Sequence, residues 1–171
     1  DDSEKTIYVN TFSKSLASTM RISYMVLPAH LINKFYKELS FYSCTVSVFE
    51  QYTLATFIER GYFEKHINRK RIHYSKQREK VLSAIARSSL SDKCQVVEND
   101  SGLHFLLKLD TDLSDKKIIE ELHEKSINIS ALSQFYTKEK EEDKHTFLFN
   151  YSNIDDSKLD STLEVISDII S

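Results

Sequence analysis

The chain contains only two glycines and one proline among its 171 residues, and neither residue type occurs between Tyr62 and Ser89. Glycine and proline are the residues that most often interrupt helices and strands. A segment of this length without either one predicts a single long helix, and the overall scarcity favours helices over an all-β fold. Gly61 stands just before this segment, where we expect it to be the C-cap of a preceding helix over residues 46–60.

The remaining elements are expected at short intervals. In residues 29–42 the apolar side chains follow helical spacing, which predicts an amphipathic helix packed on one side. Later segments alternate strand and helix patterns, and together they predict an α+β sandwich in which a small antiparallel sheet is covered by helices. The expected strands are 94–98, 103–109, 127–132 and 146–151, with a turn at Asn99–Gly102, a helix over 115–125 capped by Ser114, and a last helix over 156–170.

Near the start of the chain, a lysine lies between two predicted strands. Residues 5–9 are β-branched and aromatic, which predicts a short strand, and Lys14 is expected in the loop after its C-terminal end. Residues 21–27 predict a second strand that ends at Pro28. We therefore expect Lys14 and Arg21 to face each other across one strand-loop-strand crossing, and open sheets bind ligands at such strand ends.

The residue types around Lys14 suit a phosphorylated aldehyde. A lysine that forms a Schiff base near neutral pH must be partly uncharged, which requires a neighbouring cation or burial. Arg21 can supply this charge and can also bind phosphate through two parallel hydrogen bonds. Hydroxyl groups at Thr11, Ser13 and Ser15 are further candidate phosphate donors. The alternative interpretation is an ordinary surface loop that is rich in hydroxyl groups.

The same residues resemble a known family. Thr-Phe-Ser-Lys-x-Leu, followed by Arg-x-x-Tyr-x-Val-Leu-Pro, is similar to the cofactor-lysine segment of fold-type I aminotransferases, in particular the aminotransferase-like domains of MocR-type regulators in the GntR superfamily. The resemblance continues through nearly the whole chain, in Glu50-Gln51, 57–61, 64–66, 69–74 and 102–104.

This resemblance implies a pyridoxal 5'-phosphate (PLP) cofactor in the full-length parent protein. Lys14 would be the Schiff-base lysine, Arg21 the phosphate-binding arginine, and Thr11 and Ser13 hydroxyl contacts to the phosphate. An amino-acid or amine effector and a homodimer are expected as well. Two departures are that Ser18-Thr19-Met20 replaces the usual Pro-Gly, and that no arginine follows Arg87, although transaminases commonly place a substrate-carboxylate arginine near the last strand.

The resemblance also indicates that the chain is a C-terminal fragment. The family's pyridine-nitrogen aspartate, ring-stacking aromatic and phosphate cup lie well upstream of the lysine, yet only 13 residues precede Lys14. We expect residues 1–61 to be the tail of the large PLP-binding domain, 62–91 a long connecting helix and 92–171 the small C-terminal domain. Such a fragment is expected to be catalytically inactive and to leave apolar surface around Ile7, Val9, Ile22 and Met25 uncovered.

Composition limits the other classes of function. A net charge of −3 and a pI near 6.1 give no nucleic-acid signature, and the basic residues between Lys65 and Lys80 are interpreted as a solvated helix face. DNA binding is therefore expected only through a winged helix-turn-helix upstream. No metal site is expected from the six histidines, and Cys44 and Cys94 form no redox motif. With no signal peptide or membrane span, a cytoplasmic protein is expected.

Three functions are compatible with these features. The first is the PLP-binding, aminotransferase-like effector domain of a GntR/MocR-type transcriptional regulator. The second is part of a free-standing class I/II aminotransferase, and the third is a non-catalytic packing or dimerisation module.

Overall fold

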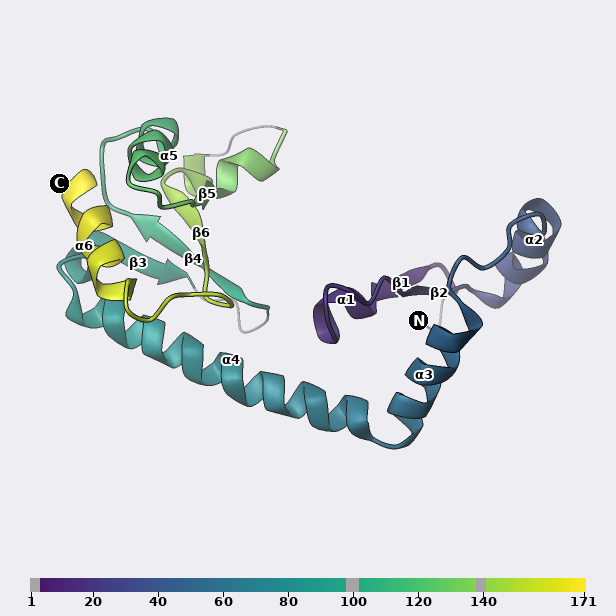
Figure 1. The fold of residues 1–171 in the computed structure, drawn as a ribbon. Helices are drawn as coiled ribbons and strands as arrows, with labels where there is room; N and C mark the ends of the chain where they lie inside the picture. The colour runs from purple at the N-terminus through teal and green to yellow at the C-terminus, as the bar shows by residue number, and fades with distance from the viewer. Residues whose placement is uncertain (1–3, 98–101, 138–140) are drawn as a thin grey trace. The chain divides into compact units, whose positions relative to one another are not determined.

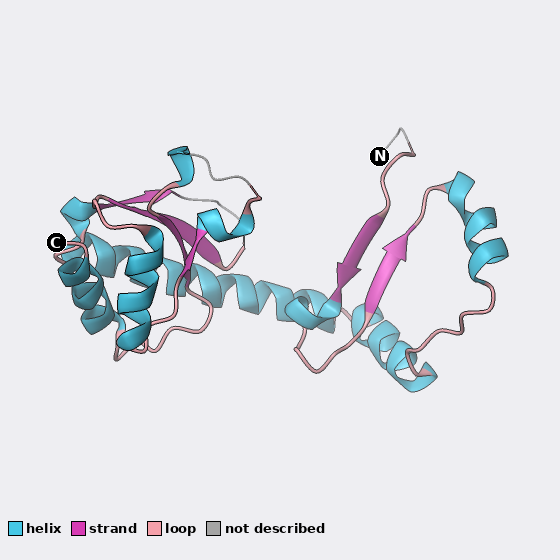
Figure 2. Ribbon diagram, turned by 90° about the horizontal axis from the view of Figure 1, so that it is seen from above, coloured by secondary structure: helices cyan, strands magenta, loops and turns pink. Residues whose placement is uncertain are grey.

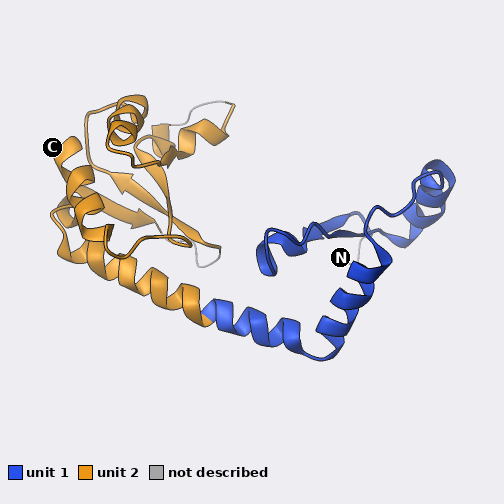
Figure 3. Ribbon diagram, viewed as in Figure 1, with its two compact units in different colours: residues 1–71 blue, residues 72–171 orange. Residues whose placement is uncertain are grey.

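A computed structural model of the chain describes residues 4–97, 102–137 and 141–171 (Figure 1). The chain forms two compact units, residues 1–71 and residues 72–171, and the boundary lies inside the long helix α4 (Tyr62–Arg87) (Figure 3). This helix confirms the expectation from the segment without glycine and proline. Across the described ranges, no helix is both long enough and apolar enough to cross a membrane.

The first unit begins with a hairpin of two short strands. β1 (Tyr8–Thr11) pairs antiparallel with β2 (Ser23–Val26), and the register places Tyr8 opposite Val26 and Thr11 opposite Ser23. The first strand therefore lies further along the chain than the predicted 5–9, because pairing with β2 rather than local residue preference sets its bounds. Between the strands, α1 (Phe12–Ser15) replaces the predicted loop around Lys14.

Two helices complete this unit before α4. In α3 (Val48–Glu59), the Ser47 side chain accepts a hydrogen bond from the Glu50 amide at the N-terminus, and Gly61 follows the C-terminus with a φ of +70°. The expected glycine C-cap is confirmed, since a side chain would be strained at that φ. The prediction that the helix over residues 29–42 is packed on one side was wrong. The observed helix α2 (Ala29–Leu39) buries no side chain, although its apolar residues follow helical spacing.

Much apolar surface of the first unit is open, as expected from the sequence. Ile7, Val9 and Met25 are 47%, 64% and 46% exposed. The expectation was wrong for Ile22, which is only 7% exposed. Its carbonyl accepts a hydrogen bond from the Phe12 amide at 2.9 Å, so Ile22 lies against the α1 turn at the closed end of the hairpin.

The second unit is built around one antiparallel sheet (Figure 2). Its strands are β3 (Cys94–Val97), β4 (His104–Leu109), β5 (Ser130–Ala131) and β6 (Thr146–Asn150), in the spatial order β3-β4-β6-β5. Two helices follow β4 and β6, namely α5 (Asp115–Glu124) and α6 (Leu159–Ile169). Short 3₁₀ turns occur at Ser91–Lys93, Leu132–Phe135 and Glu141–Asp143.

One face of this sheet carries the core. Phe105, Leu107 and Leu109 alternate with less buried residues along β4, as expected for a strand with one covered face. The rings of Phe105 and Phe149 stack at 5.1 Å between centroids. The helices contribute Val81, Ala84 and Ile85 from α4, Ile118 and Leu122 from α5, and Leu159, Leu163 and Ile166 from α6. The predicted antiparallel sheet covered by helices is therefore confirmed.

Some predicted bounds in this unit were wrong. The strand expected over 127–132 pairs with β6 only at Ser130 and Ala131, because the chain turns into a 3₁₀ helix from Leu132. The last helix begins at Leu159 rather than 156. Ser114 caps α5 as predicted, with its hydroxyl accepting from the Lys117 amide at 3.4 Å. Of the predicted turn, residues 99–101 lie outside the described residues.

We predict that Leu163→Ala destabilises the second unit by about 2–5 kcal/mol, because the fully buried Leu163 side chain leaves a cavity. Urea unfolding followed by circular dichroism measures the change. Glu164→Ala, at an exposed position of the same helix, is the matched control and is expected to change stability by less than about 0.5 kcal/mol. Equal effects of the two substitutions would contradict the assigned core.

A second prediction concerns Asp156, whose pKa is lowered by hydrogen bonds from Lys80 and then from Gln77. A carboxylate with a lowered folded-state pKa stabilises the fold above its unfolded pKa of about 3.9, and this contribution is lost as the pH falls through the folded value. Lys80→Met should raise the NMR titration midpoint of Asp156, whereas Lys158→Met should leave it unchanged. No rise in the Lys80 variant would show that the ammonium does not set this pKa.

Candidate functional site

Lys14 lies in a single helical turn at the closed end of the β1–β2 hairpin. Thr11 is the N-cap of α1, and its hydroxyl accepts a hydrogen bond from the Ser13 amide at 3.3 Å. The Leu16 amide donates to the Phe12 carbonyl at 2.8 Å and closes the turn. A four-residue helix is too short to be stable by itself, so its position depends on the contacts around it.

Side-chain and main-chain hydrogen bonds hold both neighbours of Arg21 against this turn. The Ser13 hydroxyl donates to the Met20 carbonyl at 2.5 Å, and the Phe12 amide donates to the Ile22 carbonyl at 2.9 Å. Thr11 Oγ1 also lies 3.2 Å from the Ile22 carbonyl oxygen. The structure therefore brings the main chain of Arg21 next to the segment that carries Lys14.

The loop between α1 and Arg21 forms a turn without the glycine that the family usually has there. The Met20 amide donates to the Ala17 carbonyl at 2.9 Å, which closes a tight turn through Ser18 and Thr19. Among the described non-glycine residues, positive φ angles occur only at Glu4, Ser126 and His145, so this loop needs no left-handed residue. Ser18-Thr19-Met20 can therefore take the place of a glycine-containing sequence.

The four predicted site residues differ in what they offer to a ligand. Lys14 and Arg21 are exposed, and within the described ranges neither side chain forms a hydrogen bond or ion pair, with each other or elsewhere. The hydroxyls of Thr11 and Ser13 instead contact main-chain carbonyl oxygens. An amine for an aldehyde and a guanidinium for a phosphate are thus available, which fits PLP, whereas the two hydroxyls would have to change partners to donate to phosphate.

An aromatic cluster lies beside the turn. The Tyr24 ring is 5.4 Å from that of Phe12 and 6.0 Å from that of Tyr8, between centroids. A hydrogen bond with Tyr8 is the main reason that the pKa of Tyr24 is raised. Tyr24 is 40% exposed, so it is not a core residue in this unit.

Three residues of α4 also contact the Lys14 segment, a role that was not predicted from the sequence. The rings of Phe12 and Phe63 meet edge to face at 5.8 Å. His66 Nε2 lies 3.1 Å from the Ser15 carbonyl oxygen, and Lys70 Nζ lies 3.2 Å and 3.4 Å from the carbonyl oxygens of Lys14 and Leu16. Lys70 was expected on a solvated face, and this interpretation was wrong for Lys70. The spacing of positions 63, 66 and 70 places these residues on one helix face, which was the available signal.

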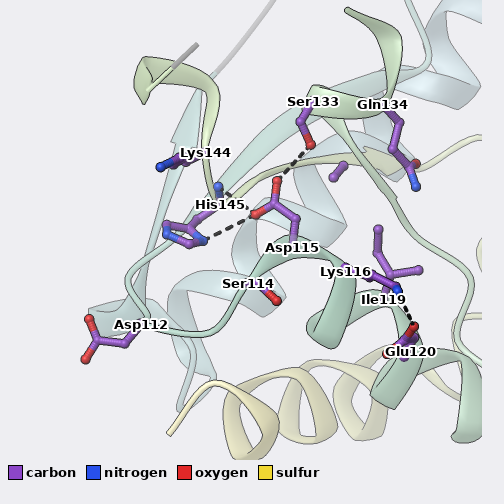
Figure 4. Close-up of a pocket in the computed structure, with 11 residues that line it drawn as sticks. Asp112, Ser114, Asp115, Lys116, Ile119, Glu120, Ser133, Gln134, Lys144 and His145 are labelled. Carbon is purple, nitrogen blue, oxygen red and sulfur yellow. Dashed lines mark hydrogen bonds and ion pairs between the residues drawn. The ribbon is translucent and has the colours of Figure 1, made fainter. Parts of the chain in front are cut away.

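A cavity of about 660 Å³ lies in the second unit and contains none of the predicted site residues (Figure 4). Asp115, at the start of α5, accepts hydrogen bonds from the Ser133 hydroxyl at 2.9 Å and the His145 amide at 3.0 Å. His145 Nδ1 lies 3.3 Å from Asp115 without hydrogen-bond alignment. These contacts join three segments of the fold around a positive φ at His145. Nowhere in the described ranges do three or more metal-binding side chains cluster.

Two bacterial regulatory proteins are similar to this chain in sequence. The chain is 40% identical over 136 residues to the uncharacterized HTH-type transcriptional regulator YdeL of Bacillus subtilis, covering 80% of this chain and 29% of that protein. It is 34% identical over 137 residues to the probable rhizopine catabolism regulatory protein MocR of Rhizobium meliloti, covering 80% and 28%. The chain thus spans less than a third of the length of these regulators.

Solved aminotransferases share the fold. The kynurenine aminotransferase of Pyrococcus horikoshii superimposes with a TM-score of 0.81 at 26% identity, over 99% of this chain and 41% of that enzyme. The multiple substrate aminotransferase of Thermococcus profundus gives the same TM-score at 23% identity. The family model for aminotransferase class I and II matches residues 1–166, and the hairpin that carries Lys14 lies inside this match. The chain therefore belongs to the aminotransferase class I and II family.

Proposed function

We propose that this chain is the C-terminal part of the PLP-binding, aminotransferase-like effector domain of a MocR-type transcriptional regulator in the cytoplasm. The observation that supports the proposal is the turn that brings the main chain of Arg21 next to the segment that carries Lys14, in a chain that is 40% identical to a helix-turn-helix regulator. DNA contact would be made by a helix-turn-helix segment upstream. The natural effector would be an amino acid or amine that reaches the cofactor.

The residues of this turn would hold PLP from two sides. Lys14 would bind the aldehyde covalently as a Schiff base, and Arg21 would bind the phosphate. Bound PLP supplies an electron sink for chemistry on amines. The missing arginine after Arg87 favours sensing over transamination, because the β6 segment offers no guanidinium for a substrate carboxylate.

The alternative is a segment of a free-standing aminotransferase. It is favoured by the structural match to kynurenine aminotransferase over 99% of this chain. In that case Lys14 would also move a proton between substrate and cofactor. The N-terminal region of the full-length protein separates the alternatives, since a winged helix there would support the regulator and a plain N-terminal arm the enzyme.

We predict that Lys14 reacts with PLP more readily than other exposed lysines of the first unit. Trapping with borohydride and peptide mass spectrometry should show labelling of Lys14 exceeding that of Lys34 and Lys37 on the order of ten-fold, because Arg21 holds the phosphate nearby. Arg21→Met should remove most of this preference, while the exposed Arg69→Met should not. Equal labelling of all three lysines in the unsubstituted chain would contradict the proposed cofactor site.

We also propose that the chain self-associates through apolar surface of the first unit. On α3, Val48, Phe49 and Tyr52 are 65%, 80% and 72% exposed, and apolar surface of this kind favours association. Sedimentation velocity should show association that increases with concentration and that decreases in Phe49→Ser/Tyr52→Ser. Lys37→Ser, at an exposed polar position, is the control. A single monomeric species at all concentrations would contradict this proposal.

A further inference from the structure

We propose that His66 and Lys70 are positioning residues for Lys14, which they hold in place through the main chain of α1. The inference rests on the proposed function of Lys14 and deepens it. Three successive carbonyl groups, those of Lys14, Ser15 and Leu16, receive contacts from these two side chains at 3.1–3.4 Å.

The carbonyls at the end of α1 need partners from outside the helix. The last four carbonyl groups of an α-helix accept no hydrogen bond from within the helix. Because α1 consists of only four residues, this applies to most of its carbonyl groups. The C-cap residue Leu16 has φ −102° and ψ −82°, which is not the left-handed conformation that commonly closes a helix. In other helices, a glycine C-cap motif supplies main-chain donors to these carbonyl groups, and here side-chain donors from α4 take that place.

The two donors suit this position electrostatically. A helix C-terminus carries partial negative charge, and a lysine ammonium or a histidine N–H near it is stabilising. Lys70 is half-buried, and its Nζ lies within hydrogen-bond distance of two carbonyl oxygens at once. His66 is also half-buried and contacts the carbonyl between them through Nε2.

The contacts come from one face of α4 and are reinforced by packing. Positions 63, 66 and 70 are three and four residues apart, so their side chains lie in a row along the helix. Phe63 packs on the ring of Phe12, the first residue of α1. The row thus fixes α1 at its start through an aromatic contact and at its end through hydrogen bonds, with Lys14 between them.

The hydrogen bonds restrict how Lys14 can be presented. The other anchors of the turn, Thr11 and Ser13, act on its N-terminal side and on the loop before β2. Without His66 and Lys70, the C-terminal side of the turn would keep two local hydrogen bonds, from the Leu16 amide and the Ser15 hydroxyl to the Phe12 carbonyl, and neither reaches another element. The Lys14 amine would then sample more orientations relative to Arg21, which lowers its rate of reaction with a bound aldehyde.

Amide hydrogen exchange in the 171-residue chain tests the hydrogen bonds without any cofactor. In Lys70→Met/His66→Ala, the Leu16 amide should exchange about five-fold faster, as expected for the loss of hydrogen bonds that stabilise the turn. Lys70→Arg/His66→Gln keeps a donor at both positions and should restore slow exchange. Exchange that is unchanged in the first variant, or equally fast in the second, would overturn the inference.

Arg69→Met is the matched control for the helix itself. Arg69 is exposed and adjacent to Lys70 in α4, and within the described ranges its side chain forms no hydrogen bond or ion pair with α1. It should leave Leu16 exchange and the urea midpoint unchanged. If Arg69→Met accelerates exchange as much as the double substitution, the faster exchange results from a general perturbation of α4 and the inference fails.

Borohydride trapping of PLP separates the inference from the proposed function. The double variant should lose several-fold of the labelling at Lys14 but keep that at Lys34 and Lys37, and the donor-retaining variant should recover it. If the unsubstituted chain shows no preference for Lys14, the proposed function fails, while the exchange experiment still decides whether His66 and Lys70 hold the turn. Preferential labelling of Lys14 to the same degree in all variants would refute the positioning role of His66 and Lys70 but not the proposed function.

Discussion

The hydrogen bonds from the α1 turn to the residues on either side of Arg21 hold the proposed cofactor site together. Ser13 binds the Met20 carbonyl and the Phe12 amide binds the Ile22 carbonyl, so two segments that are separated by a loop become one rigid end of a hairpin. Each such bond contributes only about 0.5–1.5 kcal/mol. Together with the β1–β2 pairing, they set the main-chain positions of the lysine and the arginine relative to each other.

This arrangement gives the predicted site residues different tasks. Lys14 and Arg21 are exposed and available for chemistry, whereas Thr11 and Ser13 are used within the turn. Hydroxyl residues around a lysine can therefore stabilise the turn through hydrogen bonds to the main chain, in addition to any contact with a phosphate. The contacts from α4 add the same kind of support at the other end of the turn, where a long helix supplies what a one-turn helix cannot.

The second unit has a closed core of its own, in contrast to the open apolar surface of the first. Its sheet buries one face against α4, α5 and α6, and the stacked rings of Phe105 and Phe149 lie in that layer. In the first unit, α2 exposes its apolar residues and α3 exposes large aromatic ones. Exposed apolar surface of this extent is unusual for an isolated domain and is typical of a surface that another chain segment covers.

Much of the fold could be predicted from local patterns. The absence of glycine and proline predicted α4, Ser114 predicted the start of α5, and the alternation in residues 103–109 and 146–151 predicted the central strands. These signals succeed because backbone preference and side-chain periodicity act over a few residues. Strand bounds near Tyr8 and Ser130 were wrong, because the partner strand decides where pairing begins and ends.

The sequence by itself determined the family and the chemical groups near Lys14, since both depend on residue types at fixed spacing. Only the tertiary structure decided that Ile22 is buried, that Thr11 and Ser13 are engaged by main-chain carbonyls, and that His66 and Lys70 reach the lysine turn. These last contacts join residues more than fifty positions apart. A basic helix face looks the same in sequence whether it meets water or the carbonyl end of another helix, and only the folded chain brings that partner within hydrogen-bond distance.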